Sequence, residues 1–287
     1  MPRRPCSATL NPSPEATAVK ARPRTVIIIP ARYASTRFPG KPLADIAGEK
    51  AIVWTLRAAQ AVPEIDQVYV ATDDRRIAAV IEAAGGKALL TPQSCRNGTE
   101  RVADAALQLE LNDEDIIVNL QGDSLITPAW FVTAIVAGLR HRSGACVTTP
   151  VLRCDEASYL RFVQDRRHQR VGATSVVFDL EHRALYFSKE VLPYLSNVAA
   201  FDHTQVFHHV GLYAYRMSVL KQYSTMHIGP LERAEQLEQL RFMENGRDVY
   251  LVEVQSRGHQ FWELNNPEDV MIIERMIRDN AALSSHG

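Results

Sequence analysis

Short apolar, β-branched runs alternate with helical patterns from Thr25 onward, and this alternation constrains the fold more than any other feature of the sequence. The first run, residues 26–29, is stopped at once by Pro30, which is typical of a buried strand. Further strands are expected at 68–71, 87–90 and 116–120, with helices at 51–61, 75–84, 99–111 and about 128–139, where Thr127 would be the N-cap and Pro128 the first helical residue. Strands that alternate with helices through short connections predict a parallel sheet covered on both faces.

The pattern becomes less regular after Pro150. Strands are expected at 175–178, 185–187, 210–215 and 249–254, and helices at 230–244, ended by Gly246, and at 267–279. The sequence therefore predicts an α/β fold: a doubly wound, mainly parallel sheet with a smaller α+β lobe. We expect a tail at 1–24, an α/β core at 25–150, the lobe at 151–248, and a return to the core sheet with a terminal helix at 249–287.

Composition excludes several classes of protein. Hydrophobic residues make up 46% of the chain, charged residues 23%, and the formal net charge is −1, so no basic excess indicates nucleic-acid binding. The four cysteines form no CxxC pair, which disfavours a zinc site or a disulfide framework and favours the cytoplasm. The longest uncharged stretch, 124–139, contains a proline and falls short of the ~18 apolar residues that a membrane span needs.

The first 24 residues differ from the rest. They hold five of the fifteen prolines, five basic residues and one acid. This composition predicts a disordered tail. An organelle transit peptide is the alternative, since arginine is plentiful and acids are scarce, although no clear amphipathic helix is present.

The loop at residues 30–43 concentrates positive charge where ligands bind in open parallel sheets, beyond the carboxyl ends of the strands. Arg32, Arg37 and Lys41 would repel one another unless they face solvent or an anion, and Gly40 allows the backbone to approach that anion. A polyphosphate fits these donors, and a solvated basic loop is the alternative. Neither a Walker loop nor GxGxxG is present, which disfavours a nicotinamide-dependent dehydrogenase.

An aspartate follows the strand predicted at 116–120. Asp123 comes directly after Gly122, so its side chain is expected to project from the same edge of the sheet as the cationic loop. Near a polyphosphate, its role would be to hold Mg²⁺, which prefers one or two carboxylates together with phosphate oxygens. The alternative is a turn aspartate bonded to its own backbone.

Together these two segments resemble a known family. RYASTRFPGKPL (32–43) and QGD (121–123), with ATDD (71–74) and GTER (98–101) between them, are similar to the CTP-dependent sugar-acid cytidylyltransferases, and most of all to the 3-deoxy-manno-octulosonate (Kdo) cytidylyltransferases. The likeness runs from about residue 25 to 277 and includes ALYFSK (184–189), HVGLYAYR (209–216), PLERAEQLEQLR (230–241) and NNPEDV (265–270). The first block argues against the acylneuraminate branch.

The resemblance implies a nucleotide-diphospho-sugar transferase-like fold, with CTP bound by the core and the lobe used for substrate binding and dimerisation. It implies transfer of CMP from CTP to Kdo or a Kdo-like acid, release of pyrophosphate, Mg²⁺ as cofactor, and a cytoplasmic homodimer that serves lipopolysaccharide biosynthesis. Neither nucleic acid nor a membrane is an expected partner.

The resemblance also implies roles for individual residues. The triphosphate would be held by Arg32, Ser35, Arg37 and Lys41, and the cytosine and ribose by Ala71, Asp73, Gly98, Thr99 and Arg101. The sugar acid would be held by Gln121, Lys189, His209, Tyr213, Glu238 and Gln239. Mg²⁺ would be bound by Asp123 and at the position of Asn265. Arg37, Lys41 and Asp123 would be the catalytic residues, because they neutralise the charge that CTP and an acidic substrate bring together.

Four positions depart from the family pattern. Ser124 replaces an acid, Asn265 replaces a metal-binding aspartate, a lysine near Thr174 is absent, and Lys189 replaces an arginine that can grip a carboxylate with two donors. Glu263 lies two residues before Asn265 and would share its side of a strand, so it is a candidate for the missing carboxylate. Because the CTP loop is intact, we expect CTP binding with an acceptor other than ordinary Kdo. A catalytically weak CTP- or CMP-binding paralogue is the alternative.

Two spacings allow a structural interpretation as well as a functional one. On a continuous helix at 230–244, Glu232, Glu235, Gln236 and Gln239 would share one face, which could equally be a solvated surface. His209 and Tyr213 would share one strand face and could reach one ligand, although a hydrogen-bonded core histidine is the commoner case.

Overall fold

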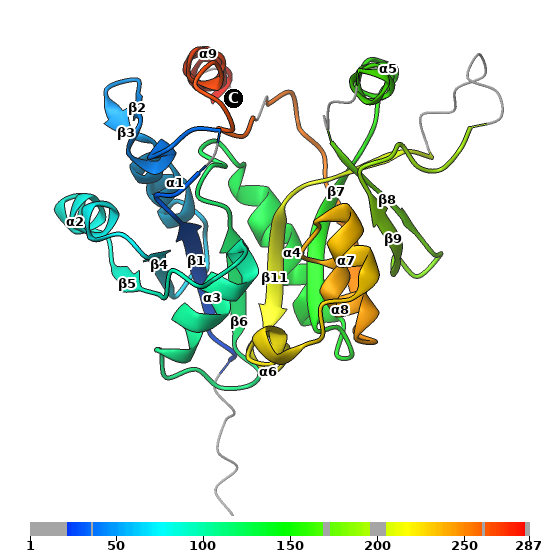
Figure 1. The fold of residues 1–287 in the computed structure, drawn as a ribbon, viewed down its shortest axis with the longest axis horizontal. Coiled ribbons are helices and arrows are strands. Elements are labelled where there is room, and N and C mark those ends of the chain that lie inside the picture. The colour runs from blue at the N-terminus through cyan, green and yellow to red at the C-terminus, as the bar shows by residue number, and fades with distance from the viewer. Residues whose placement is uncertain (1–21, 36, 169–172, 196–204, 260–261, 285–287) are drawn as a thin grey trace, which may run out of the picture.

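A ten-stranded mixed sheet runs through the residues that this computed structural model describes, namely 22–35, 37–168, 173–195, 205–259 and 262–284 (Figure 1). Its N-terminal part is parallel, in the order β5-β4-β1-β6. These strands are β1 (Thr25–Ala31), β4 (Gln67–Thr72), β5 (Ala88–Leu90) and β6 (Ile116–Leu120). Every residue of β1 and β6 is buried, as strands covered on both faces must be.

Four helices cover the two faces of this parallel part. They are α1 (Ala51–Gln60), α2 (Arg75–Ala83), α3 (Gly98–Leu107) and α4 (Ala129–His141). Val26 and Ile28 of β1 pack in the same hydrophobic cluster as α3, whereas Ile27 and Ile29 pack with α1, α2 and α4. Successive side chains of a strand point to opposite faces, which explains why β1 is an unbroken apolar run. The predicted doubly wound α/β class is confirmed.

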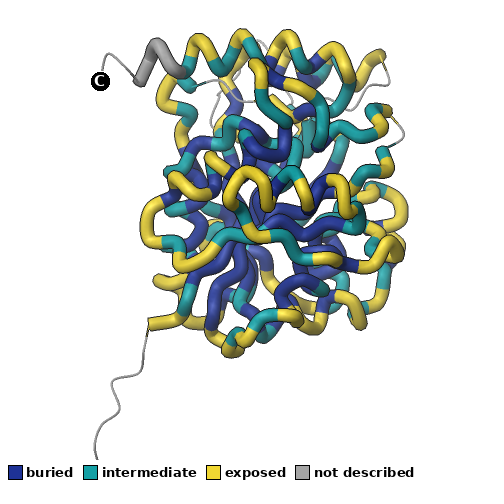
Figure 2. The backbone as a smooth tube through the Cα atoms, turned by 90° about the vertical axis from the view of Figure 1, so that its left-hand side faces the viewer, coloured by how far each residue is buried: buried dark blue, intermediate teal, exposed yellow. Residues whose placement is uncertain are grey.

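The second half of the chain extends the same sheet with mainly antiparallel strands. β11 (Leu212–Arg216) pairs with β6 and with β7 (Val147–Arg153), and β12 (Val249–Glu253) returns to lie parallel to β7. Beyond them lie β10 (Phe207–His209), β8 (Thr174–Phe178) and β9 (Ala184–Ser188), with α5 (Glu156–Arg167) nearby. β7 and α5 were not predicted from the sequence pattern. Figure 2 shows buried residues concentrated in the interior of the molecule and exposed residues along its outer turns.

The predicted helix at 230–244 is wrong, because the chain forms two short helices there. α7 (Pro230–Glu235) ends at Gln236, which adopts a left-handed conformation with φ 53°, and α8 (Leu240–Glu244) begins four residues later. Glu232, Glu235, Gln236 and Gln239 therefore do not form one continuous helical stripe. The break places Glu238 and Gln239 on an irregular connection, from which their side chains contact the central sheet and α3.

Other boundaries differ by smaller amounts. The strand expected at 210–215 begins at Leu212, because a tight turn at Val210 separates it from β10. Pro128 is itself the N-cap of α4, in place of Thr127. The terminal helix, α9 (Asp269–Ser284), begins two residues later than predicted.

The remaining elements are short. They are η1 (Lys41–Leu43), β2 (Asp45–Ile46), β3 (Glu49–Lys50), α6 (Met217–Leu220) and η3 (Tyr223–Thr225). Among the helices of the described residues, none is both long and apolar enough to cross a bilayer.

Most of the predicted tail, residues 1–21, lies outside the described residues. Arg22 and Arg24, at its end, form ion pairs with Asp66 (2.8 Å) and Asp115 (3.0 Å).

Gly122, in the loop after β6, lies where the fold leaves no room for a side chain. A Cβ atom there would lie 2.7 Å from the carbonyl oxygen of Pro30 at the end of β1. We expect Gly122→Ala to lower the free energy of unfolding by about 1–3 kcal/mol, because the two strand ends must move apart. Urea denaturation measures this loss. Gly144→Ala is the matched control, since its Cβ would meet nothing within 4 Å, and an equal loss in both variants would contradict the account.

Candidate active site

The carboxyl ends of β1 and β6 are adjacent, and the cationic loop and Asp123 both start there. Ile28 of β1 is paired with Asn119 of β6, so the segments that follow these two strands leave the sheet side by side. The loop folds back on itself through a hydrogen bond from the Gly40 N–H to the Tyr33 carbonyl oxygen (2.9 Å). Gly40 has φ 72°, and an added Cβ would lie 3.0 Å from the Tyr33 ring, so glycine is required on both counts.

Lys41 joins three segments of the chain at this point. Its ammonium forms an ion pair with the Asp123 carboxylate and donates a hydrogen bond to the Leu264 carbonyl oxygen (3.1 Å). The Leu264 N–H in turn donates to the carbonyl oxygen of Asp123 (3.0 Å). The side chains of Lys41 and Asp123 are 19% and 22% exposed, so this ion pair is partly shielded but open to an incoming ligand.

Arg37 makes a second link from the loop to the segment before α9. It donates to Asn265 Oδ1 (2.9 Å), and the Asn265 amide donates to Glu263 Oε2 (3.4 Å). The N–H groups of Asn265 and Asn266 both donate to the Asp269 carboxylate (2.8 and 2.6 Å), which fixes this segment at the start of α9. The predicted loop and the predicted metal position are therefore brought together.

Glu263 is on the same side of the chain as Asn265, although residues 262–265 do not form the strand that was considered for them. The residue keeps contact with solvent, but protein atoms packed around its carboxyl group and the negative charge of Asp123 raise the pKa of Glu263 to about 7. Among the described residues, no three His, Cys, Asp or Glu side chains gather as a metal cluster. The oxygen donors present are two carboxylates and one amide, from Asp123, Glu263 and Asn265.

The other loop residues have less fixed surroundings. Arg32 and Arg37 are exposed, and Ser35 Oγ accepts a long hydrogen bond from the Phe38 N–H (3.4 Å). The Arg76 guanidinium stacks on the Tyr33 ring, 3.6 Å from its centroid, which ties the loop to the start of α2.

The residues predicted for the nucleoside lie at the carboxyl end of β4 and at the start of α3. Ala71 is buried in β4, and Asp73 follows that strand. Arg101, which is 3% exposed, forms an ion pair with Asp73 Oδ2 (3.3 Å), whereas Asp73 Oδ1 is buried and accepts no hydrogen bond from the described residues. A Cβ on Gly98 would lie 2.9 Å from the Gln121 side-chain amide, so the start of α3 touches the end of β6.

Glu238 connects the nucleoside side of the site to the residues predicted for the sugar acid. It accepts hydrogen bonds from the Thr99 N–H (3.0 Å) and from Gln121 Nε2 (3.2 Å), and burial raises the pKa of its carboxyl group. Gln239 Oε1 accepts from the Tyr213 hydroxyl (3.0 Å), while Gln239 Nε2 is buried with no acceptor among the described residues. The structure thus brings Thr99, which was predicted for the nucleoside, together with four residues predicted for the sugar acid: Gln121, Tyr213, Glu238 and Gln239.

His209 lies next to Tyr213, with ring centroids 5.5 Å apart, but on β10 and not on the same strand. Its Nε2 is 2.9 Å from Thr149 Oγ1, and the Thr149 hydroxyl is 2.7 Å from the Leu212 carbonyl oxygen. Since the hydroxyl proton goes to that carbonyl, Oγ1 accepts from the Nε2–H of the imidazole. Burial lowers the pKa of His209 to about 3, so the ring is neutral at pH 7.

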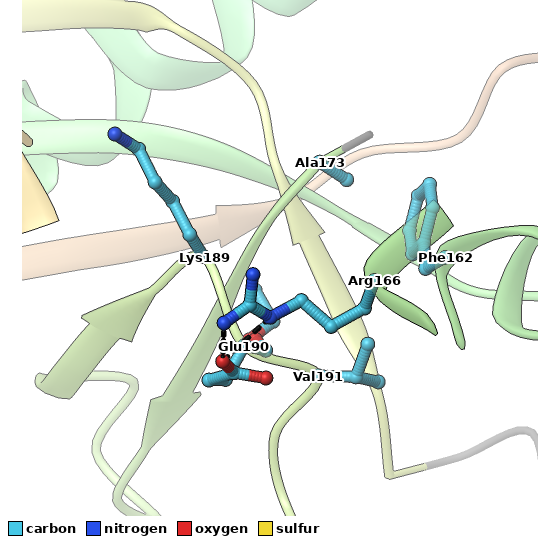
Figure 3. Close-up of a pocket in the computed structure, with 7 residues that line it drawn as sticks. Phe162, Arg166, Ala173, Lys189, Glu190 and Val191 are labelled. Carbon is cyan, nitrogen blue, oxygen red and sulfur yellow. Dashed lines mark hydrogen bonds and ion pairs between the residues drawn. The ribbon is translucent and has the colours of Figure 1, made fainter. Parts of the chain in front are cut away.

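Lys189 follows β9 and lines a small pocket in which none of the other predicted site residues takes part (Figure 3). Phe162, Arg166, Ala173, Ser175, Glu190 and Val191 line the rest of it. The Lys189 side chain points away from the Arg166–Glu190 ion pair, and its backbone N–H donates to Glu235 Oε2 (2.9 Å). The role predicted for Lys189 stays a prediction.

A buried ion-pair triad, which was not predicted from the sequence, holds the site together. Arg241 is 1% exposed and donates to Glu100 of α3 (2.9 Å) and with two nitrogens to Glu232 of α7 (2.6 and 2.8 Å). The triad fixes α3 against the connection that carries Glu238 and Gln239. On one continuous helix, Arg241 would lie on the face opposite Glu232, nine residues away, and the break at Gln236 lets the two side chains meet. The buried Asn119, which donates to Thr99 Oγ1 (3.4 Å), was also missed.

Comparison with known proteins gives consistent matches over most of the chain. A family model described as Cytidylyltransferase matches residues 26–249. A 3-deoxy-manno-octulosonate cytidylyltransferase of Maricaulis maris is 41% identical over 250 residues, or 87% of this chain and 95% of the relative. An 8-amino-3,8-dideoxy-manno-octulosonate cytidylyltransferase of Shewanella woodyi is 38% identical over 249 residues, or 86% and 96%.

Solved structures agree with the sequence matches. The structure of a CMP:2-keto-3-deoxy-manno-octonic acid synthetase complexed with CTP has a TM-score of 0.78 and 32% identity, over 90% of this chain and 99% of that one. A 4-diphosphocytidyl-2C-methyl-D-erythritol synthase has a TM-score of 0.58 at 11% identity, over 89% and 99%, and therefore shares the fold alone.

The depressed pKa of His209 predicts a dependence of stability on pH. The folded-state pKa of about 3 lies below the ordinary 6.5, so the unfolded chain binds the proton more readily. This contribution is fully present above pH 6.5 and is lost as the pH falls toward 3, by about 2 kcal/mol between pH 7 and 5. We expect His209→Gln to remove that part of the pH dependence in urea denaturation. His168→Gln, at an exposed site, should leave it intact, and a wild-type slope in His209→Gln would contradict the assignment.

Proposed function

The chain belongs to the cytidylyltransferase family, and we propose that it transfers CMP from CTP to Kdo or a closely related acidic sugar, releasing pyrophosphate. One observation carries this proposal: the cationic loop after β1 meets Asp123, at the end of β6, in a fold that matches a CTP-bound synthetase with a TM-score of 0.78. The names of the relatives agree with an acceptor of the Kdo type.

The triphosphate would lie along the loop that carries Arg32, Ser35, Arg37 and Lys41. Lys41 and Arg37 now bond to the Asp123 carboxylate and to the Asn265 amide oxygen. A triphosphate carries more negative charge than a single carboxylate or an amide oxygen. Both cations would therefore exchange these contacts for the triphosphate when CTP binds. The loop would then neutralise the charge that develops on the departing pyrophosphate.

The nucleoside would lie between Asp73 and the start of α3. The buried and unpaired Asp73 Oδ1 is an acceptor that suits an amino or hydroxyl donor of cytidine, and Arg101 holds Asp73 in place. Ala71, near the end of β4, and Gly98, at the start of α3, would line this side of the site. Thr99 would contribute from the same turn of α3.

The acidic sugar would lie on the other side of Gln121, against Tyr213, Glu238 and Gln239. The unpaired Gln239 Nε2 is a donor that suits a hydroxyl or carboxylate oxygen of the sugar, and Glu238 would accept from a hydroxyl. His209 backs the Tyr213 ring, and Lys189 would approach the acid from the lobe. In these positions the anomeric hydroxyl would lie near the end of β6, in line for attack on the α-phosphorus of CTP.

A magnesium ion fits the oxygen donors at the end of β6. Asp123 would supply a carboxylate, and residues 263–265 would supply a further oxygen donor, the hard kind of ligand that Mg²⁺ takes together with phosphate oxygens. When bound, the ion would offset phosphate charge and favour ionisation of the attacking hydroxyl. The residues of the chain do the rest: they hold the two anionic substrates together and orient them for displacement of pyrophosphate.

We further propose that the enzyme works in the cytoplasm as a homodimer and serves lipopolysaccharide biosynthesis. β9 ends the path of hydrogen-bonded strands in the described sheet, and Leu185 on it is 58% exposed. The outer edge of such a strand presents backbone N–H and C=O groups with which another chain can pair.

An acceptor panel tests the proposed reaction. Pyrophosphate release would be measured with CTP, Mg²⁺ and, in turn, Kdo, 8-amino-3,8-dideoxy-manno-octulosonate and N-acetylneuraminate. We expect turnover with at least one of the first two and none with the third. Because Lys189 and Asn265 depart from the family pattern, we expect 8-amino-Kdo to be preferred to Kdo. Clear preference for Kdo would show that these departures are neutral, and no turnover with any acceptor would contradict the proposed function.

The Lys41 ammonium gives a second test. We expect Lys41→Met to lower kcat/KM for CTP by about 10²-fold or more, because one preorganised cation is lost from the phosphate site. Lys50→Met is the matched control, since Lys50 is on β3 and pairs only with the exposed Asp45 among the described residues. Steady-state kinetics at saturating acceptor measure both variants. Similar kinetics for Lys41→Met and the wild type would remove Lys41 from the phosphate site.

A further inference from the structure

Residues 263–265 present two polar side chains to the end of β6. Both backbone groups of Leu264 are bonded toward that strand, its N–H to Asp123 (3.0 Å) and its carbonyl oxygen to Lys41 (3.1 Å). The hydrogen bond from the Asn265 amide to the Glu263 carboxylate (3.4 Å) shows that these two side chains lie on the same side of the segment. Glu263 therefore belongs to the same small site as Asp123 and Lys41.

Asn265 makes two side-chain hydrogen bonds, and one of them orients Glu263. Its amide nitrogen donates to the Glu263 carboxylate, whereas its Oδ1 accepts from Arg37 (2.9 Å), which would turn to the triphosphate when CTP binds. An amide also brings no negative charge to a cation. In contrast, the Glu263 carboxylate receives only that one long hydrogen bond from the described residues, which leaves most of its acceptor capacity free.

The position of Glu263 suits a residue that coordinates a cation at the reacting centre. A Cβ built on Gly211 would lie 3.8 Å from Glu263 Oε1 and 4.0 Å from Cγ of Gln121, so the carboxylate reaches the region beside Gln121 where the acceptor would bind. Lys41 now offsets the charge of Asp123. Once Lys41 turns to the triphosphate, Asp123, Glu263 and the phosphate oxygens would face one another with no cation between them. Such a set of oxygen anions is stable only around a bound cation.

We propose that Glu263 supplies the second carboxylate of the divalent-cation site, and that Asn265 is a positioning residue that orients it. The inference rests on the proposed function and deepens it. The family pattern has an aspartate at the position of Asn265, so this chain keeps two carboxylates by moving one of them two residues toward the N-terminus. Two carboxylates together with phosphate oxygens are an ordinary set of ligands for Mg²⁺.

Binding of Mn²⁺ to the full-length protein tests the proposal without any turnover. Free Mn²⁺ would be counted by its electron paramagnetic resonance signal, with CTP present and acceptor absent. We expect Glu263→Gln to raise the Kd for Mn²⁺ by about 10-fold or more, since a charged ligand becomes a neutral one. Asn265→Ala should change the Kd by less than about 3-fold. Glu268→Gln, an exposed carboxylate in the same motif, is the matched control and should match the wild type.

A double variant guards against a folding defect. We expect Glu263→Gln combined with Asn265→Asp to recover Mn²⁺ affinity to within about 3-fold of the wild type, because the second carboxylate is restored at the other position. Wild-type affinity in Glu263→Gln, a larger loss in Asn265→Ala than in Glu263→Gln, or no Mn²⁺ binding by the wild type would each overturn the proposal.

The two proposals fail separately. CMP transfer by the wild type with unchanged Mn²⁺ affinity in Glu263→Gln would overturn the role of Glu263 and leave the reaction standing. Weakened Mn²⁺ binding in that variant, with no transfer by the wild type to any acceptor, would support the cation site and overturn the proposed reaction.

Discussion

The site depends on one interaction, the contact of the Lys41 ammonium with Asp123 and with the Leu264 carbonyl oxygen. It joins the loop after β1, the end of β6 and the segment before α9, which are far apart in the sequence. The same ammonium is the strongest candidate for holding a phosphate. The contact that joins these three segments in the absence of substrate is therefore the one that a triphosphate would take over, and its replacement would release the Asp123 carboxylate for a metal ion.

The surrounding structure makes that exchange possible because it holds the ends of β1 and β6, and α3, in place. Parallel pairing of β1 with β6 fixes the two strand ends, and the close approach of Gly122 to Pro30 keeps them together. The buried triad around Arg241 locks α3 to the connection that bears Glu238. Removing one partner of such a buried triad would leave an unpaired charge, which costs about 3–5 kcal/mol. Phosphoryl transfer requires a fixed site whose cationic side chains can turn to the substrate, because its catalysis is mainly positioning and neutralisation of charge.

Sequence patterns predicted the parallel half of the sheet well, because strands buried on both faces read as unbroken apolar runs. They also predicted that the cationic loop and Asp123 meet, since the ends of neighbouring parallel strands share one edge. The break at Gln236 could not be predicted: the residues around it form a good helical pattern, and tertiary contacts of Glu238 and Arg241 override that local preference. For the same reason the Arg241 triad left no signal in the spacing. Glu263 was found only through its distance of two residues from Asn265.

A crystal structure of the protein with CTP and Mg²⁺ would show directly whether the triphosphate takes over the contacts of Lys41 and Arg37. We expect Lys41 Nζ to leave the Asp123 carboxylate and bond to a phosphate oxygen, Arg37 to leave Asn265 in the same way, and Asp123 to bind the metal ion. A complex in which Lys41 and Asp123 remain paired, with the triphosphate held elsewhere, would contradict this expectation.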